Sequence, residues 1–249
     1  MRKRTLLIGL ALGFATATAS AETLVVSAAA SLSNAFKDIN TQFEKANPGD
    51  TVDMTTGASG SLLQQIQQGA PADVFASADQ ATMDRAAKAN LIDTASRTNF
   101  VTNSLVLIVP TAANTKVDSI DALKDASVTR VAVGKTETVP VGRYTQKVLQ
   151  ASGDWDALSP KFIPGDNVRQ VLDYVARNEV DAGFVYRTDA ALMADKVKVV
   201  ATAKTPTPIT YPIAVIADSK QPALAAKYIK YLASDDARAV LERYGFGKP

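Results

Sequence analysis

The feature that most constrains the fold is an alternation of short apolar runs and amphipathic stretches along almost the whole chain. The apolar runs have the length and composition of strands, and the amphipathic stretches repeat their apolar residues at helical spacing. This order predicts α/β layers with mostly parallel sheets. Strands are expected at 23–27, 51–56, 73–76, 101–109, 129–133, 160–163, 181–186, 197–201 and 209–216. Helices are expected at 31–46, 59–68, 79–89, 119–124, 140–151, 167–178, 187–194 and 221–242, the last broken near Ser234.

Two extended segments far apart in the sequence indicate two lobes. One covers 97–110, and the other, 204–212, holds three prolines and several threonines. A chain that crosses twice between lobes needs two such connections. We therefore expect a first lobe made of 22–103 and 212–249, and a second lobe made of 104–211. With 249 residues, of which 47% are hydrophobic, the chain is long enough to give two small lobes their own cores.

The first 21 residues have the pattern of a secretory signal. Basic residues come first, an apolar run follows from 6 to 17, and Ala19-Ser20-Ala21 offers an A-x-A cleavage site. We expect cleavage after Ala21 and export of a soluble protein. The alternative is a short membrane anchor, but the apolar run is shorter than the roughly 20 residues that a membrane-spanning helix needs.

The charge of the chain gives no sign of a nucleic-acid partner. The net charge is +2, and since residues 1–21 contain three basic and no acidic side chains, it is −1 for the rest. The sequence pI of about 8.7 therefore belongs to the precursor and does not indicate nucleic-acid binding.

The absence of cysteine and histidine excludes several functional classes. Without cysteine there can be no disulfide, thiolate metal site or lipid anchor on a cysteine. Without histidine the chain lacks the commonest general base and zinc ligand, and a Ser-His-Asp triad is impossible. A Ser-Lys dyad remains formally open, but no lysine flanks Ser31 or Ser59 in a telling motif, and there is no G-x-S-x-G turn. A secreted hydrolase is therefore the weaker alternative to a binding protein.

Two serines lie where an expected strand turns into an expected helix. Ser31, in "SAAASLS", precedes the first helix, and the small residues before it would let a ligand approach the backbone. Ser59, in "TGASGSLLQQIQQGAP", fits the N-cap of a helix that Gly69 and Pro71 end. Each serine is either an ordinary helix cap or a ligand donor.

Two further helix starts offer backbone donors. In "TVPVGRY", Pro140 suits the first helical position, so Val141 supplies the first free amide. In "PGDNVRQVL", Asp166 or Asn167 caps a helix that Val168 opens. Helix N-termini carry unpaired N–H groups and about half a positive charge, so several of them around one crevice could hold a small anion without lysine or arginine.

Five other residues are weaker candidates for roles in a site. Tyr186 ends the strand in "GFVYRTD", where its hydroxyl could donate into a crevice or merely pack at an interface. Arg187 beside it is expected at the surface. Asp73 and Asp79 are conceivable as an acid–base pair, but we favour a structural role for Asp73 and a helix cap for Asp79. Trp155 is expected to pack at the surface of a lobe.

Several segments in order resemble the periplasmic molybdate-binding proteins of ABC uptake systems. They are "VVSAAASLSNAF", "GAPADVFASADQ", "NSLVLIVP", "VAVGKTETVPVGRY", "DNVRQVLDYVARNEVDAGFVY" and the ending "RYGF", and the resemblance covers essentially all of 22–249. It implies a type II periplasmic-binding-protein fold, in which two extended hinge segments join two α/β lobes. It also implies a periplasmic, non-enzymatic monomer without a cofactor, which delivers molybdate or tungstate to a membrane permease. The alternative is a receptor for sulfate or another tetrahedral oxyanion.

The resemblance also implies which residues bind the oxyanion. By position in their motifs these are Ser31 and Ser59 through hydroxyl and amide, Val141 and Val168 through their amides, and Tyr186 through its hydroxyl. The segment "GASGS" departs from the family pattern, because glycine follows Ser59 where another hydroxyl residue is frequent. This leaves open whether Ser59 or Ser61 is the donor. "VPVG" carries valine where alanine is frequent. Asp166 is expected to cap or face away, since an acceptor carboxylate would favour phosphate.

Overall fold

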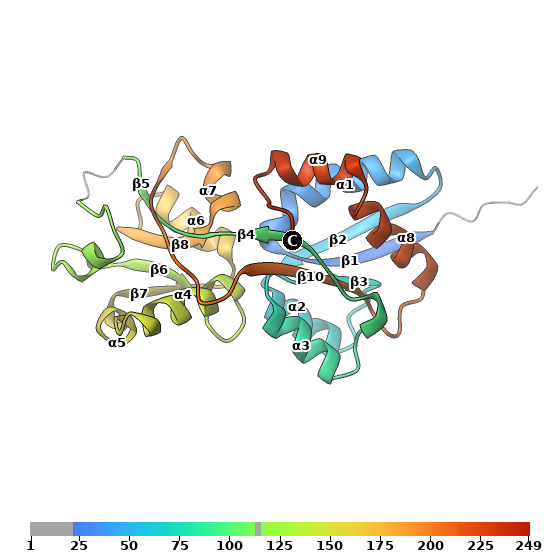
Figure 1. The fold of residues 1–249 in the computed structure, drawn as a ribbon, viewed down its shortest axis with the longest axis horizontal. Coiled ribbons are helices and arrows are strands. Elements are labelled where there is room, and N and C mark those ends of the chain that lie inside the picture. Colours follow the sequence, from blue (N-terminus) through green and yellow to red (C-terminus); the bar gives the residue numbers. More distant parts are fainter. Residues whose placement is uncertain (1–21, 113–115) are drawn as a thin grey trace, which may run out of the picture.

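The computed structural model describes residues 22–112 and 116–249, which form two α/β lobes side by side (Figure 1). The predicted signal at 1–21 and its cleavage after Ala21 lie outside the described residues. In the described part of the chain, no helix is both long and apolar enough to cross a membrane.

The first lobe contains a five-stranded sheet with helices on both sides (Figure 1). Its strand order is β2 (Thr51–Gly57), β1 (Thr23–Ala29), β3 (Val74–Ala76), β10 (Ile209–Val215) and β4 (Thr98–Asn103). Its helices are α1 (Ser33–Ala46), α2 (Ser59–Gln67), α3 (Gln80–Lys88), α8 (Pro222–Leu232) and α9 (Asp235–Arg243), with 3₁₀ turns at Ala30–Leu32 and Thr94–Ser96.

The second lobe repeats this plan with the central part of the chain. Its strand order is β7 (Phe162–Gly165), β6 (Val131–Gly134), β8 (Ala182–Tyr186), β5 (Leu105–Pro110) and β9 (Val197–Thr202). Its helices are α4 (Pro140–Ala151), α5 (Trp155–Leu158), α6 (Val168–Ala176) and α7 (Arg187–Leu192), with 3₁₀ turns at Asp121–Lys124 and Ser159–Lys161. The two-lobed α/β fold predicted from the sequence is confirmed. The boundaries of the lobes at 103/104 and 211/212 stay a prediction.

Both sheets are mixed, but in each of them four of the five strands run in the same direction, which agrees with the prediction of mostly parallel sheets. β1 pairs in parallel with β2 and β3, and β6 pairs in parallel with β7 and β8. β10 is antiparallel to β3 and β4, and β5 is antiparallel to β8 and β9. The antiparallel pairs all contain β5 or β10, because these strands begin where the chain has just crossed from the other lobe and run against their neighbours.

The predicted strand 101–109 is wrong, because it is two strands in different lobes. β4 ends at Asn103 in the first sheet, and β5 begins at Leu105 in the second. Ser104 lies between them, where the chain crosses. The polar residues Thr102, Asn103 and Ser104 lie at the junction of the two strands, and the predicted lobe boundary at 103/104 falls at this place. The expected break in the last helix is confirmed, since α8 ends at Leu232 and Ser234 caps α9.

The core of each lobe lies where the apolar helix stripes meet the sheet. In α1 the buried residues Ala35, Phe36, Ile39 and Phe43 recur at helical spacing. In α6 the buried residues Val168, Val171, Leu172 and Val175 do the same. These stripes fix how each helix lies on its sheet. They therefore also fix where the helix N-termini point.

Candidate functional site

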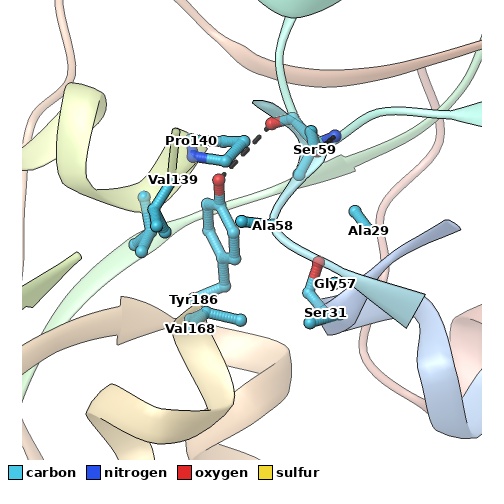
Figure 2. Close-up of a pocket in the computed structure, with 12 residues that line it drawn as sticks. Ala29, Ser31, Gly57, Ala58, Ser59, Val139, Pro140, Val168 and Tyr186 are labelled. Atoms are coloured by element: carbon cyan, nitrogen blue, oxygen red, sulfur yellow. Dashed lines mark hydrogen bonds between the residues drawn. The ribbon is translucent and has the colours of Figure 1, made fainter. Parts of the chain in front are cut away.

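All five predicted ligand residues line one cavity between the lobes (Figure 2). The cavity is small, since the free space at it, including the part that is open to solvent, is only about 200 Å³. Its twelve lining residues are Ala29, Ala30, Ser31, Gly57, Ala58, Ser59, Ala78, Val139, Pro140, Val141, Val168 and Tyr186. None of them carries a formal charge, so any anion held there is held by neutral donors.

The topology explains why these residues meet. Ser31 follows β1, Ser59 follows β2 and Ala78 follows β3, which are the three parallel strands of the first sheet. Residues that follow parallel strands lie at the same edge of a sheet, where α/β proteins form their ligand crevices. Val141 and Val168 open helices that follow β6 and β7 in the second sheet.

Tyr186 is the last residue of the third parallel strand, β8. The second sheet therefore also faces the cavity with the carboxyl ends of its parallel strands. The two lobes face each other across it.

The backbone at each helix start presents N–H groups toward the cavity. Asn167 caps α6 by accepting hydrogen bonds from the N–H groups of Arg169 and Gln170, which leaves the N–H of Val168 free. Pro140 occupies the first position of α4 and has no N–H, so Val141 supplies the first. Among the described residues, nothing accepts a hydrogen bond from the N–H of Ser31, Ser59, Val141 or Val168.

Neither Ser31 nor Ser59 is a helix cap, which was one of the two roles that the sequence left open for them. Ser31 lies within the 3₁₀ turn Ala30–Leu32, and the residue before that turn is Ala29. Ser59 is the first residue of α2, and its N-cap is Ala58. Neither serine side chain makes a capping hydrogen bond. Both residues instead line the cavity (Figure 2).

The hydroxyls of Ser59 and Tyr186 share one neighbour, Ala78. The N–H of Ala78 donates to Ser59 Oγ at 3.0 Å, which leaves the serine proton free to donate elsewhere. The hydroxyl of Tyr186 donates to the carbonyl oxygen of Ala78 over a long 3.4 Å (Figure 2). Ala78 was not among the predicted residues, although its place just after β3 was a signal that could have found it.

Burial keeps the tyrosine hydroxyls at the site in their donor form. Tyr186 and Tyr211 are almost fully buried and their rings lie 5.7 Å apart. Loss of water contact raises the pKa of Tyr186 well above its ordinary value of 10, and neighbouring tyrosine and aspartate groups add to the shift. Burial likewise raises the pKa of Tyr211. Both hydroxyls therefore keep their protons at any physiological pH.

Two arginines of the second lobe reach across to the first lobe beside the cavity. Arg143 of α4 bonds through Nε to Asp79 Oδ2 at 2.7 Å and through Nη2 to Thr82 Oγ1 at 2.7 Å. Arg169 of α6 bonds to Asn34 Oδ1 at 2.9 Å and to the carbonyl oxygen of Ser31 at 3.3 Å. These contacts hold the lobes closed over the cavity without placing a charge in it.

Arg169 is itself anchored within the second lobe by Asp189. Its Nε lies 2.6 Å from Asp189 Oδ1. No N–H of Arg169 points squarely at the carboxylate, so this is an ion pair rather than an aligned hydrogen bond. Burial outweighs the attraction of the guanidinium and raises the pKa of the Asp189 carboxyl to about 6.

The remaining sequence candidates lie away from the cavity. Asp73 accepts hydrogen bonds from the N–H of Val25 at 2.8 Å and from Ser219 Oγ at 2.6 Å, a structural role. Asp79 caps α3, as predicted. Trp155 packs on Phe162. Asp166 is exposed and paired with Lys135, Arg187 is exposed, and Ser61 and Ala28 do not line the cavity.

Comparisons with known proteins agree with this geometry. Residues 24–247 match the family model described as bacterial extracellular solute-binding protein. The molybdate-binding protein ModA of Escherichia coli (strain K12) is 42% identical over 250 residues, which cover 97% of this chain and 96% of that protein.

Solved structures are similar over nearly the whole chain. The substrate-binding domain of a putative molybdenum ABC transporter from Clostridium difficile is 37% identical, with a TM-score of 0.69 over 92% of this chain and 99% of that one. The sulfate-binding protein SubI from Mycobacterium tuberculosis H37Rv has a TM-score of 0.80 at 16% identity, over 90% of this chain and 86% of that one. The last likeness concerns the fold alone.

Proposed function

Because this chain belongs to the bacterial extracellular solute-binding proteins, in the family of the molybdate-binding protein ModA, we propose that it captures molybdate for an ABC transporter. The proposal extends to tungstate, which has nearly the same size and charge. As a solute-binding protein the chain is not an enzyme. We further propose that it acts as a periplasmic monomer, after removal of 1–21, and hands its ligand to the membrane permease.

One observation carries the choice of ligand: Ser31, Ser59, Val141, Val168 and Tyr186 converge on a single uncharged cavity between the lobes. Molybdate at neutral pH is a tetrahedral dianion that only accepts hydrogen bonds. The five residues offer it two serine hydroxyls, one phenol and four backbone N–H groups. A cavity lined by donors without a counter-charge suits such an ion, because fixed dipoles need little reorganisation on binding.

The strength of binding can be estimated from these donors. Seven hydrogen bonds to a charged group, at roughly 1.5–3 kcal/mol each, give a gross contribution of about 10–20 kcal/mol. Ordering and lobe closure consume part of it. A net free energy near −8 to −12 kcal/mol corresponds to a dissociation constant between about 1 μM and 1 nM.

Sulfate is the second candidate, because a sulfate-binding protein shares the fold. Sulfate carries the same charge, but its bonds are shorter, so a cavity fitted to molybdate would contact it less well. Phosphate is disfavoured, because it is partly protonated at neutral pH and needs an acceptor. Asp166, two residues before Val168, is exposed and paired with Lys135.

Isothermal titration calorimetry on residues 22–249 with molybdate, tungstate, sulfate and phosphate tests the proposal. We expect molybdate and tungstate to bind with similar affinity, and sulfate and phosphate to bind at least about 100-fold more weakly, a difference of about 2.7 kcal/mol. Thermal melting provides the check, since ligand at 1,000 times its dissociation constant stabilises the protein by about 4 kcal/mol. Binding of sulfate with no heat from molybdate would refute the proposal.

A further inference from the structure

Behind Ser31 lies a chain of hydrogen bonds that reaches to the place where the polypeptide crosses between the lobes. Ser31 Oγ lies 3.0 Å from the hydroxyl oxygen of Tyr211, and both groups are buried. Asn103 Nδ2 donates to the same tyrosine oxygen at 3.2 Å. Tyr211 belongs to β10 and Asn103 is the last residue of β4, so each crossing segment supplies one member.

The orientation of the Asn103 amide is fixed by its other partners. Its Oδ1 accepts a hydrogen bond from the N–H of Ser104 at 2.9 Å, so the oxygen must face that group. The Nδ2 group then faces Tyr211 and Thr188, and donates to Thr188 Oγ1 at 2.9 Å. An amide nitrogen can only donate. The hydroxyl of Tyr211 must therefore accept from Asn103.

The orientation of the Asn103 amide determines where the hydroxyl protons of Tyr211 and Ser31 point. With its oxygen accepting from Asn103, Tyr211 can satisfy its own buried proton only by donating it to Ser31 Oγ, its one other hydrogen-bond partner in the described chain. The reverse arrangement would leave a buried phenol proton without an acceptor, which is unfavourable. Ser31 Oγ therefore accepts from Tyr211, and its proton is left to donate into the cavity.

We propose that Tyr211 and Asn103 are positioning residues that hold the Ser31 hydroxyl as a donor toward the cavity, and so select fully deprotonated oxyanions over protonated ones. The proposal rests on the proposed function. The oxygen of Ser59 is likewise an acceptor, because Ser59 Oγ accepts a hydrogen bond from the N–H of Ala78. Each serine oxygen already accepts one hydrogen bond and directs its own proton toward the ligand, so only one lone pair of each remains for the proton of a protonated oxyanion.

A double-mutant cycle measured by calorimetry tests whether Tyr211 acts through Ser31. We expect Tyr211→Phe to weaken molybdate binding about 10-fold in the wild-type background, the worth of one hydrogen bond of about 1.4 kcal/mol. In the Ser31→Ala background, where no hydroxyl remains to be oriented, the same change should alter affinity less than about 2-fold. Equal losses in both backgrounds would show that Tyr211 only packs, and would overturn the proposal.

The affinity for inorganic phosphate, compared with that for molybdate, gives a second measurement. A merely structural change would not alter the ratio of the two affinities. Without the Tyr211 hydroxyl, Ser31 is no longer held as a donor toward the cavity, and it can rotate to accept the proton of hydrogen phosphate. We therefore expect the ratio of molybdate to phosphate affinity to fall about 10-fold or more in Tyr211→Phe, the equivalent of about 1.4 kcal/mol. An unchanged ratio would overturn the selectivity part of the proposal.

Tyr228→Phe is the matched control. Tyr228 is a second fully buried tyrosine of the first lobe, and its hydroxyl bonds to Asn40 Oδ1 at 2.6 Å, away from the cavity. Its loss should lower the melting temperature without changing either anion affinity. If the wild type bound none of the oxyanions, both the proposed function and the positioning role of Tyr211 would be refuted. If the wild type bound molybdate but the effects of Tyr211→Phe and Ser31→Ala were additive, only the positioning role would be refuted.

Discussion

At the scale of single residues, the site depends on where each hydroxyl proton points. Ser59 shows this most simply, because the N–H of Ala78 occupies its oxygen and leaves its proton for a ligand. Ser61, two residues further along α2, makes no such contact and does not line the cavity. The placement of the two side chains favours Ser59 in the register that the sequence left open. Binding by Ser59 itself remains a proposal.

Alanine substitutions at these two positions would decide the register. We expect Ser59→Ala to weaken molybdate binding about 10- to 100-fold, because a hydrogen bond to a charged group contributes about 1.5–3 kcal/mol. It should also lower the stability of the ligand-free protein, since the buried N–H of Ala78 loses its acceptor. Ser61→Ala is the control and should change affinity less than about 2-fold. Calorimetry would contradict the assignment if Ser61→Ala lost more affinity than Ser59→Ala.

At the scale of elements, the position of the Val141 amide depends on how closely α4 approaches β6. Gly142 follows Val141 in α4, and a Cβ atom at that position would lie 1.9 Å from the carbonyl oxygen of Gly134, at the end of β6. Backbone atoms on both sides cannot yield as a flexible side chain would. Any side chain at 142 must therefore push the start of α4 away from the sheet, and Val141 with it.

Whether Gly142→Ala raises or lowers the free energy of unfolding tests this packing. In an ordinary helix interior glycine to alanine stabilises by up to about 1 kcal/mol. Here we expect a loss of about 1–3 kcal/mol in the free energy of unfolding, from overpacking, together with weaker molybdate binding. Urea unfolding and calorimetry measure the two quantities. Gln150→Ala, on an exposed position of the same helix, should leave both nearly unchanged. A more stable Gly142→Ala protein would refute the close approach.

At the scale of the whole molecule, contacts between the lobes complete the cavity. The N–H of Gly60 donates to the carbonyl oxygen of Thr138 at 2.9 Å, and Arg143 and Arg169 bond across the same boundary. Arg143 and its partner Asp79 are both largely buried, with side chains 18% and 5% exposed. Without Arg143, the closed form would bury the Asp79 carboxylate with no partner, which is costly. In an open form, water could reach that carboxylate. Arg143 therefore favours the closed form.

Replacing Arg143 should shift the molecule toward the open form. We expect Arg143→Met to weaken molybdate binding about 10-fold or more and to speed its dissociation, because a ligand leaves once the lobes part. Stopped-flow dissociation and calorimetry measure these effects. Arg97→Met is the control, since Arg97 pairs with Asp84 and Gln80 inside the first lobe. Equal losses in the two variants would show that the charge of the arginine matters and the link between lobes does not.

Local sequence patterns were enough to predict candidate residues for the site. Strand-to-helix turns, Pro140 at a helix start and Asn167 as a cap are local signals, because each depends on residues within one turn of the backbone. The alternation of elements likewise predicted two α/β lobes. Which oxyanion donors could exist, and that none of the five carried a charge, followed from these local patterns and the family resemblance.

Only the tertiary structure decided which distant segments meet. It divided the predicted strand 101–109 between two sheets at Ser104, and it showed that both serines lie inside the first turn and do not cap it. It also brought Tyr211 to Ser31, 180 residues earlier in the chain. Long-range pairing and burial control these features. A local pattern cannot encode the direction of a hydroxyl proton, because that direction depends on partners supplied by other strands.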